Sequence, residues 1–313
     1  GAGLPLGLAL VLLLNLALLW WMGRGAEGSA LARVGRGLGD LGRALWARRA
    51  AVLWSEGMFL AGFTALALIR ALNPDLWHPI WGGEKPMELG FLNAVLRSPV
   101  LPPYDPFFSG GYINYYYYGY FLVALPVRMA GLPAAMGFNL ALATIAGLTL
   151  AAAFALVSQL TGRARYGALA AALVGVAGNL AGFFAVGWSR GFPAVADALR
   201  QGGLAGFGAR LGDWFVGPSR VIPYTINEFP AFAFLYADLH PHTIALPITL
   251  LALALGYRLV DGKASLPETE ARALPQGRAP LLLLGLALGT LAVTNSWDVP
   301  TYALVAGLVL LGA

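Results

Sequence analysis

Long apolar stretches alternate with shorter polar segments along most of the chain. These stretches approach or exceed the roughly 20 residues that a helix needs to cross a bilayer. They occur at about 4–22, 51–72, 137–158, 166–187, 241–260, 279–294 and from 300 to the end. We therefore predict an all-α fold, a polytopic transmembrane protein with a single transmembrane domain over residues 1–313. Because the chain starts and stops in apolar sequence, we expect it to be a fragment of a longer chain.

The composition supports a membrane protein. Hydrophobic residues make up 58% of the chain and charged residues only 11%, against the roughly 25% charged residues of a soluble domain. Cysteine is absent, which excludes disulfides, thiolate nucleophiles and sulfur metal ligands. The net charge of +5 arises from arginines that lie mainly in short segments between the apolar stretches. We therefore expect membrane lipid as a partner and no nucleic acid.

The basic segments predict how the chain crosses the membrane. Segments 23–50, 161–165 and 261–278 carry arginine and lysine residues, which favour the cytoplasmic side. The number of crossings between these segments then places residues 73–136 and 188–240 outside. These are the expected first and second external loops.

Both large external loops are expected to contain short interfacial helices, and two of these helices can be located in the first loop. Residues 82–96 have Pro86 early and then apolar residues at helical spacing, which predicts an amphipathic helix lying on the membrane. Residues 116–130 are short and open with tyrosines, which predicts an interfacial or re-entrant helix. The predicted order of membrane crossings also places the unusual polar residues on the external side. These are Glu84, Lys85, Glu88, Asp105, Asn114, Glu228, Asp238, His240, His242, Asn295 and Asp298.

The run Asp238-Leu239-His240-Pro241-His242 is the strongest candidate site, because ionisable groups at membrane depth are costly and usually functional. Alternate residues lie on one face of an extended segment. Pro241 disfavours a helix at His240, so we expect an extended entry to a helix that begins near 241, with the three side chains converging. Imidazoles with a carboxylate suit zinc, manganese or iron better than calcium. The alternatives are a metal-free site, in which a histidine binds phosphate or relays a proton, and a hydrogen-bonded cap.

The order of these features resembles known membrane enzymes. An external carboxylate, a surface helix, a Pro-Pro turn at 102–103 and a tyrosine-led apolar helix resemble the first external loop of the GT-C class of glycosyltransferases. The two apolar stretches after residue 137 are similar to the inward and outward spans that follow in that class. The tyrosine run 115–118, the string Glu84-Lys85-Pro86-Met87 and the run 238–242 resemble a narrower group over about residues 80–302, the bacterial and archaeal "YYY" membrane protein family of unknown function.

The GT-C resemblance implies transfer of a sugar from a polyprenyl-phosphate donor to an acceptor, with inversion at the anomeric carbon. Glu84 would orient or deprotonate the acceptor. Glu88 competes for this role, because many members have aspartate where this chain has glutamate. Asp238, His240 and His242 would hold a divalent metal (Mn, Zn or Mg) or the lipid phosphate itself. The expected substrate-binding residues are Lys85, Asp105, Asn114, Tyr115, Glu228, Asn295, Trp297 and Asp298. The expected location is the plasma membrane of a bacterium or archaeon, with the active site facing outside.

Two other function classes fit the same residues. A transporter or channel would use them as an external ion or proton site, and a non-catalytic membrane scaffold would use them to hold loops together. The tyrosine run equally fits an aromatic belt, and residues 294–300 equally fit a turn with an aromatic anchor. The sequence has no Walker loop, Gly-x-Ser-x-Gly elbow or His-Glu-x-x-His motif, so ATP hydrolysis, serine hydrolysis and zincin proteolysis lack motif support. A transferase requires Glu84 close to the histidines.

Overall fold

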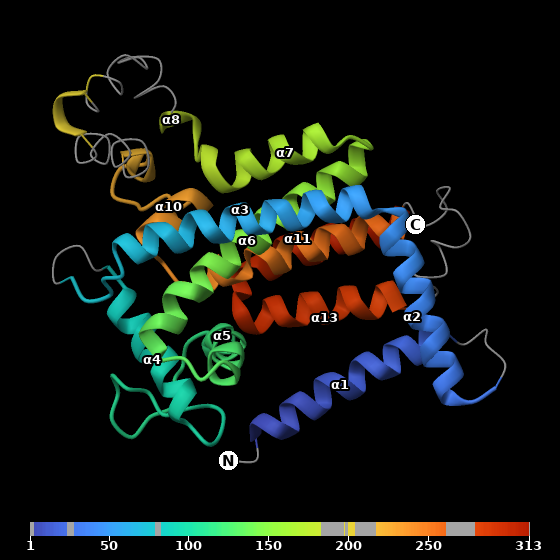
Figure 1. Ribbon diagram of the computed structural model, residues 1–313. Helices are drawn as coiled ribbons and strands as arrows, with labels where there is room; N and C mark the ends of the chain where they lie inside the picture. The colour runs from blue at the N-terminus through green and yellow to red at the C-terminus, as the bar shows by residue number, and fades with distance from the viewer. Residues whose placement is uncertain are drawn as a thin grey trace. The chain divides into compact units, whose positions relative to one another are not determined.

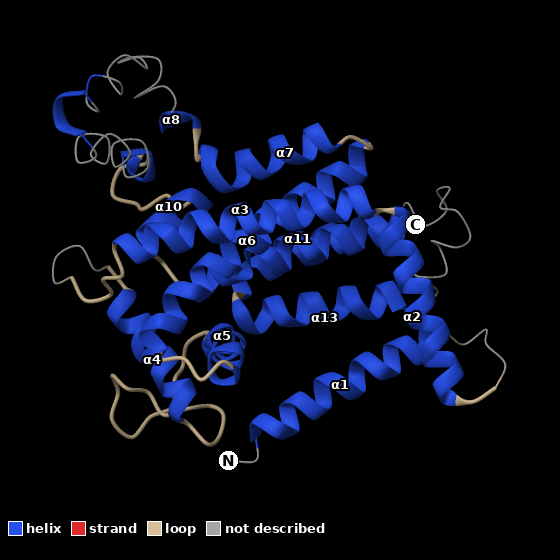
Figure 2. Cartoon of the chain, in the orientation of Figure 1, coloured by secondary structure: helices blue, strands red, loops and turns tan. Residues whose placement is uncertain are grey.

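The computed structural model describes residues 3–23, 28–78, 83–182, 197, 200–203, 217–260 and 279–312. Regular structure in these ranges is helical (Figure 2). Within the same ranges, Tyr104 and Tyr112 form an isolated antiparallel bridge. The predicted all-α class is therefore confirmed. Most of the expected second external loop and the basic segment 261–278 lie outside the described residues.

The main helices can be followed along the colour gradient of Figure 1. Their bounds are α1 (Gly3–Met22), α2 (Ala30–Ala47), α3 (Arg49–Leu72), α4 (Lys85–Arg97), α5 (Tyr117–Met129), α6 (Ala134–Thr161), α7 (Ala164–Ala172), α8 (Leu180–Gly182), α10 (Pro230–Tyr236), α11 (Pro241–Val260), α13 (Ala279–Thr294) and α14 (Val299–Gly312). A π-helical turn (Leu173–Ala177) follows α7, and 3-10 turns cover Gly217–Arg220 and Ser296–Asp298.

Three helices are long and apolar enough to cross a membrane: α3, α6 and α11. Shorter apolar helical segments cover Val11–Trp21, Ala164–Ala177, Pro280–Thr294 and Ser296–Leu311. All seven predicted apolar stretches therefore contain helix. Helices α4 and α5 have 13 residues each, which at 1.5 Å per residue is too short to span a bilayer. The short helices predicted at residues 82–96 and 116–130 are thus present as helices.

The stretch 166–187 differs from the uninterrupted helix that its hydrophobicity predicts. The helix from Ala164 ends at Ala177, and Gly178 adopts φ 66°, a conformation that glycine reaches without steric cost. A Cβ atom at Gly178 would also lie 2.6 Å from the ring of Phe229. Asn179 then accepts a hydrogen bond from Ala181 N at 3.0 Å and starts the short helix α8. Hydrophobicity alone does not register a break caused by one glycine.

The chain divides into two compact units. Unit 1 comprises residues 1–56, 91–134 and 248–313. Within it α1 packs against α2, and α13 contacts both α5 and α14. The ring of Phe91 stacks on Tyr115 and contacts Tyr120. The tyrosine-rich start of α5 is therefore part of an aromatic core in this unit.

Unit 2 comprises residues 57–90 and 135–247 and is built around α3, α6 and α7, which lie side by side in Figure 1. A Cβ atom at Gly147 on α6 would lie 2.7 Å from the carbonyl oxygen of Phe59 on α3. A Cβ atom at Gly167 on α7 would lie 2.5 Å from the carbonyl oxygen of Phe154 on α6. Small residues thus allow these helices to approach closely, as is common between membrane helices.

Candidate functional site: an acid–histidine cluster

Six ionisable side chains of unit 2 meet in one place. We call them the acid–histidine cluster: Glu84, Glu88, Glu228, Asp238, His240 and His242. They come from the start of α4, from the residues before α10 and from the link between α10 and α11. The structure therefore brings together residues that lie up to 158 positions apart in the sequence.

The start of α4 places two carboxylates on one side. Glu84 directly precedes the helix, which begins at Lys85, and Glu88 N donates to Glu84 O at 3.0 Å. Residues four positions apart in a helical turn lie on the same face. Their environments differ, because 59% of the Glu84 side chain is exposed and none of the Glu88 side chain is. Glu84 is accessible to a substrate, and Glu88 supports the site from inside.

The link between α10 and α11 is extended, as the proline predicts. Helix α10 ends at Tyr236, and Ala237 adopts the left-handed conformation with φ 62°. Asp238 N donates to Ala233 O at 2.9 Å, which closes the end of the helix. Residues 238–240 are extended, and α11 begins at Pro241, whose missing N–H costs nothing at a helix start. The predicted extended entry is confirmed.

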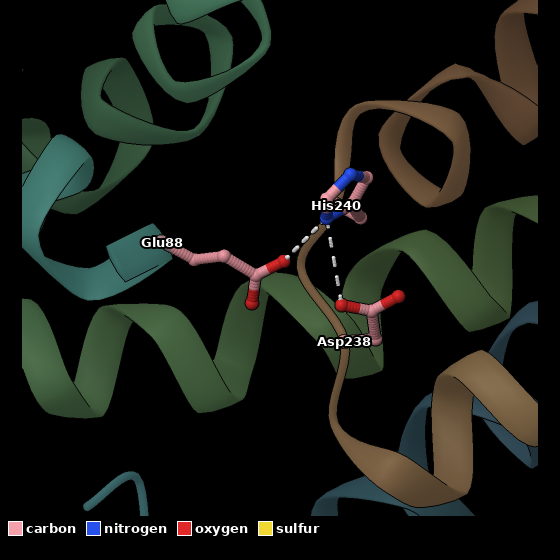
Figure 3. A group of neighbouring side chains, drawn as sticks. All are labelled: Glu88, Asp238 and His240. Atoms are coloured by element: carbon pink, nitrogen blue, oxygen red, sulfur yellow. Dashed lines mark hydrogen bonds and ion pairs between the residues drawn. The ribbon is translucent and has the colours of Figure 1, made fainter. Parts of the chain in front are cut away.

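His240 is the centre of one half of the cluster (Figure 3). Its Nδ1 lies 3.2 Å from Glu88 Oε1, 3.1 Å from Glu84 Oε2 and 3.8 Å from Asp238 Oδ1. The second oxygen of Glu88 accepts a hydrogen bond from Leu239 N at 3.1 Å. Glu88 therefore holds both the imidazole of His240 and the backbone that carries it.

His242 is the centre of the other half. Its Nε2 lies 3.1 Å from Glu228 Oε2 and 3.8 Å from Asp238 Oδ2. The rings of His240 and His242 have centroids 5.2 Å apart. Asp238 thus presents one carboxylate oxygen to each histidine. The predicted convergence of Asp238, His240 and His242 is present in the structure.

Lys85 lies beside the cluster and is fixed by the end of α10. Its Nζ donates to Tyr236 O at 2.9 Å and lies 4.1 Å from the centre of the Tyr236 ring. Gly83 adopts φ 58°, and a Cβ there would lie 2.7 Å from the same ring. Lys85 is 6% exposed. The predicted substrate-binding lysine is therefore a buried cation that connects α4 to α10.

Burial dominates the electrostatics of the cluster. It raises the pKa of Glu88 to about 7, and the charge of Glu84 contributes in the same direction. Burial, followed by the adjacent Glu88 carboxylate, raises the pKa of Asp238 to about 9, and burial also raises the pKa of Glu228. Glu88 and Asp238 share a side-chain hydrogen bond. Two such carboxyls avoid repulsion either by sharing a proton or by binding a cation.

The donor types of the cluster fit a metal ion. Glu88, Asp238 and His240 form one group, and Glu228, Asp238 and His242 form another, each with potential ligand atoms within 4.8 Å of one another. Mixed imidazole and carboxylate ligands are those of zinc, manganese and iron sites. Chemically, the cluster can bind a cation, bind an anion through that cation, and accept a proton at Glu84.

The remaining predicted site residues belong to unit 1. Asn295 Nδ2 donates to Asp298 Oδ2 at 3.0 Å, so these two are together, and the neighbouring Trp297 is 80% exposed. Asp105 accepts a hydrogen bond from Phe107 N at 2.8 Å within its own turn. Tyr115 stacks on Phe91. Asn114 follows the buried Ile113.

Sequence reasoning missed a second charged region in unit 2. Arg70, near the end of α3, is 5% exposed, and its Nε donates to Asn139 Oδ1 at 2.6 Å and its Nη2 to Asp75 O at 3.1 Å. Asn139 Nδ2 donates to Ala135 O at 3.0 Å, which turns the amide oxygen towards Arg70. The sequence did contain a signal for this region, because Arg70 is a charged residue inside the apolar stretch 51–72.

Arg70 and Asn139 line a cavity of about 500 Å³ between α3 and α6. The other lining residues are apolar: Ala67, Ala71, Pro74, Ala135, Met136 and Leu140. Among the described residues Arg70 forms no ion pair with a carboxylate. The guanidinium is hydrogen-bonded to neutral oxygens, and the charge of Asp75 also acts on it. A buried guanidinium beside apolar walls has the chemistry to bind an anion that carries an apolar chain. We call this region the Arg70 cavity.

The comparisons with known proteins agree with a membrane protein. No curated protein and no solved structure matches the chain significantly. A family model described as an uncharacterized membrane protein matches residues 3–313, which is nearly the whole chain. The chain therefore belongs to the uncharacterized membrane protein family DUF2298.

Proposed function

We propose that this protein is a membrane glycosyltransferase of the GT-C type that transfers a sugar from a polyprenyl-phosphate donor to an acceptor. The reaction would take place at the extracytoplasmic face of the plasma membrane. One observation carries the proposal: the accessible carboxylate of Glu84 lies 3.1 Å from Nδ1 of His240. An acceptor-side carboxylate and a site for the leaving phosphate are thus adjacent, as transfer from a lipid phosphate requires.

The exposures of Glu84 and Glu88 support different roles for the two carboxylates. Glu84 is the candidate general base, because its exposed carboxylate can contact an acceptor hydroxyl. Glu88 is fully buried and binds Leu239 N and His240 Nδ1. Glu88 is therefore a positioning residue that holds the extended segment Asp238–His240 ahead of α11. This division favours Glu84 over Glu88 as the proposed general base, because only Glu84 is exposed.

The donor phosphate has two sources of positive charge. A divalent ion held by Asp238, His240 and His242 would supply charge that stabilises the leaving phosphate. The Arg70 cavity supplies a guanidinium and apolar walls, which match the phosphate and the chain of a lipid-linked donor. Lys85 is close enough for Arg70, Glu88 and Asp238 all to act on its pKa, which burial lowers. Lys85 therefore connects the two regions electrostatically.

The residues of unit 1 remain candidate sugar or acceptor contacts. Exposed Trp297 offers a flat apolar face of the kind that packs against sugar rings, and Asn295 and Asp298 offer hydrogen-bonding groups beside it. Asp105, Asn114 and Tyr115 are the corresponding candidates from the first external loop. Glu228 contacts His242 and joins the phosphate or metal side.

Donor turnover in liposomes tests the proposal without knowledge of the acceptor. Purified protein would be reconstituted with a panel of radiolabelled polyprenyl-phosphate hexoses and pentoses, and loss of the sugar to water or to added membrane extract would be measured. We expect turnover of at least one donor by the wild type. Glu84→Gln should lower kcat at least a hundredfold, because the general base is lost, whereas His240→Ala should abolish turnover.

Glu56→Gln is the matched control, because Glu56 is an exposed glutamate on α3 in unit 1. Its turnover should equal that of the wild type. Absence of turnover with every donor in the panel would contradict the proposal. Equal turnover by the wild type and Glu84→Gln would contradict it too.

A proton- or ion-coupled transporter is the second candidate. The observation that favours it is the buried Glu88–Asp238 pair, whose raised pKa values allow it to bind and release a proton near neutral pH. Liposomes with an internal pH-sensitive dye distinguish the two functions. A flux that disappears in both Glu88→Gln and Asp238→Asn, without donor turnover, would support the transporter.

A further inference from the structure

The two halves of the cluster share one residue. Asp238 directs Oδ1 towards His240 Nδ1 and Oδ2 towards His242 Nε2, at 3.8 Å in both cases. Each half then has its own second carboxylate, Glu88 beside His240 at 3.2 Å and Glu228 beside His242 at 3.1 Å. The arrangement is nearly symmetric about the Asp238 carboxylate. Each half offers one nitrogen and two oxygens.

From this geometry we infer that the cluster is a two-metal centre in which Asp238 bridges two divalent cations. The first site consists of His240, Glu88 and Asp238, with Glu84 as an additional ligand. The second consists of His242, Glu228 and Asp238. In two-metal centres the ions lie about 3.5–4 Å apart, a distance that the two oxygens of one carboxylate can bridge. The rings of His240 and His242 are neighbours, with centroids 5.2 Å apart, so one imidazole is available to each ion.

The charges of the cluster support two cations. Four carboxylates, those of Glu84, Glu88, Glu228 and Asp238, lie within contact of the two imidazoles. Among the described residues, the charges of Lys85, Arg220 and protonated His240 act on these carboxylates. A metal-bound imidazole is neutral, which leaves Lys85 and Arg220 as the cations beside a metal centre. They balance half of the negative charge. Two dications would leave the site net positive, which suits an anionic phosphate group.

The two sites differ in access, which predicts different affinities. Glu88 is fully buried and Asp238 nearly so, whereas Glu228 lies at the surface and about a third of its side chain is exposed. The first site is pre-organised by the hydrogen bond from Leu239 N to Glu88. The second depends on the loop before α10. We therefore infer that the first site binds its ion more tightly and that the second ion exchanges faster.

This inference rests on the assignment of the cluster as a metal centre in the proposed function, but its test does not measure transfer. Full-length protein in lipid nanodiscs would be stripped with a chelator and titrated with Mn²⁺. Bound ions would be counted by elemental analysis, and electron paramagnetic resonance would detect magnetic coupling between neighbouring ions. We expect two Mn²⁺ per chain with a coupled spectrum.

Variants of the second site separate the two ions. Glu228→Gln changes a surface residue, so the fold should survive, and it should bind one Mn²⁺ with the uncoupled spectrum of an isolated ion. His242→Ala should do the same. Asp238→Asn should lose the coupling and weaken both sites at least tenfold. Glu56→Gln, at an exposed position on α3 in unit 1, is the control and should retain two coupled ions. Helix content and gel filtration would show that each variant is folded.

Four results would overturn the inference: no bound Mn²⁺, one Mn²⁺ at saturation, two ions without coupling, or two coupled ions in Glu228→Gln. Failure of the proposed function gives a different result. A coupled pair of ions in a protein that turns over no lipid-linked sugar would retain the metal centre and reject the transferase. Turnover by a protein that saturates with one ion would retain the transferase and reject the two-metal centre.

Discussion

Unit 2 contains two buried charged regions of opposite sign. In the acid–histidine cluster, carboxylates surround two imidazoles, and Asp238 and Glu88 lie against each other. In the Arg70 cavity, a guanidinium is bonded to the neutral oxygens of Asn139 and Asp75. In the cluster the carboxylates outnumber the nearby basic side chains Lys85 and Arg220, and in the cavity Arg70 forms no ion pair among the described residues, although the charge of Asp75 acts on it. Because buried charge is costly without compensation, each region is suited to a ligand of the opposite sign.

The difference between the regions lies in their walls. The cluster consists of carboxylates and imidazoles, and the side chains of Glu84, His242 and Glu228 are partly exposed. The Arg70 cavity has two polar side chains, and its other walls are apolar. The chemistry of the acid–histidine cluster suits a metal cation, and that of the Arg70 cavity suits an anion with an apolar chain. The proposed lipid-phosphate donor would use both regions, because it would bind in the Arg70 cavity and react at the acid–histidine cluster.

Removal of charge at the centre of the cluster should have the largest effect. Asp238→Asn keeps the size of the side chain but removes the carboxylate that faces both histidines. We expect kcat for donor turnover to fall about a thousandfold, because both ions of the proposed metal centre would lose a ligand. Donor binding in the Arg70 cavity should remain within about twofold, measured by native mass spectrometry. A matching loss of donor binding would show that the regions are not separate.

The pH dependence of stability should reveal the crowded carboxylates in metal-free protein. Glu88 and Asp238 have pKa values raised from 4.5 to about 7 and from 3.8 to about 9. The folded state therefore holds more protons than the unfolded state between about pH 4 and 9. Stability is highest below this range and falls as the pH rises through it, by a few kcal/mol at most, roughly 5 °C in Tm.

Melting curves in detergent at pH 5, 7 and 9 would measure this dependence. Glu88→Gln should flatten the curve between pH 5 and 7, because the group that releases its proton there is gone. Saturating Mn²⁺ should reverse the trend, because metal and protons compete for the same oxygens. A Tm independent of pH in the metal-free wild type would contradict the crowding of the carboxylates.

Loss of the guanidinium should affect the donor more than the chemistry. Arg70→Met removes a buried charge that donates to Asn139 and Asp75. We expect KM for the donor to rise about thirtyfold, since hydrogen bonds to a charged group contribute about 1.5–3 kcal/mol, while kcat changes little. Donor dependence of turnover measures both constants. Arg165→Gln, at an exposed position on α7, is the control. A fall in kcat with unchanged KM would place Arg70 outside the donor site.

The smallest effect should come from a new partner for Arg70. Asn139→Asp replaces the amide oxygen 2.6 Å from Arg70 Nε with a carboxylate. The resulting ion pair should compete with the donor phosphate and raise KM about three- to fivefold, whereas Asn139→Ser should change it less. Thermal stability should change little, because the new ion pair offsets the loss of the hydrogen bonds that Asn139 Nδ2 donates to Ala135 O and Pro74 O. A lowered KM in Asn139→Asp would contradict an anion at this position.

Much of the fold follows from local sequence. Hydrophobic stretches of sufficient length predict the helices of a membrane protein, and Pro241 predicts both the start of α11 and the extended residues before it. The sequence also indicates Glu84, Asp238, His240 and His242, because ionisable groups are rare in apolar surroundings. Local rules are sufficient here because helix formation and the effect of proline depend on near neighbours. The break at Gly178 lies beyond these rules, because hydrophobicity does not detect a single positive φ.

The tertiary structure decided which of these residues meet and in what state. The sequence leaves Glu84 and Glu88 as competing candidates, and only packing makes one exposed and the other fully buried. Glu228 becomes a neighbour of His242 through the loop before α10, and Asp238 faces both histidines. Arg70 and Asn139 are joined across α3 and α6, whose approach depends on Gly62 and Gly147. Burial and contacts between distant segments arise only when the helices pack, because they depend on which surfaces exclude water.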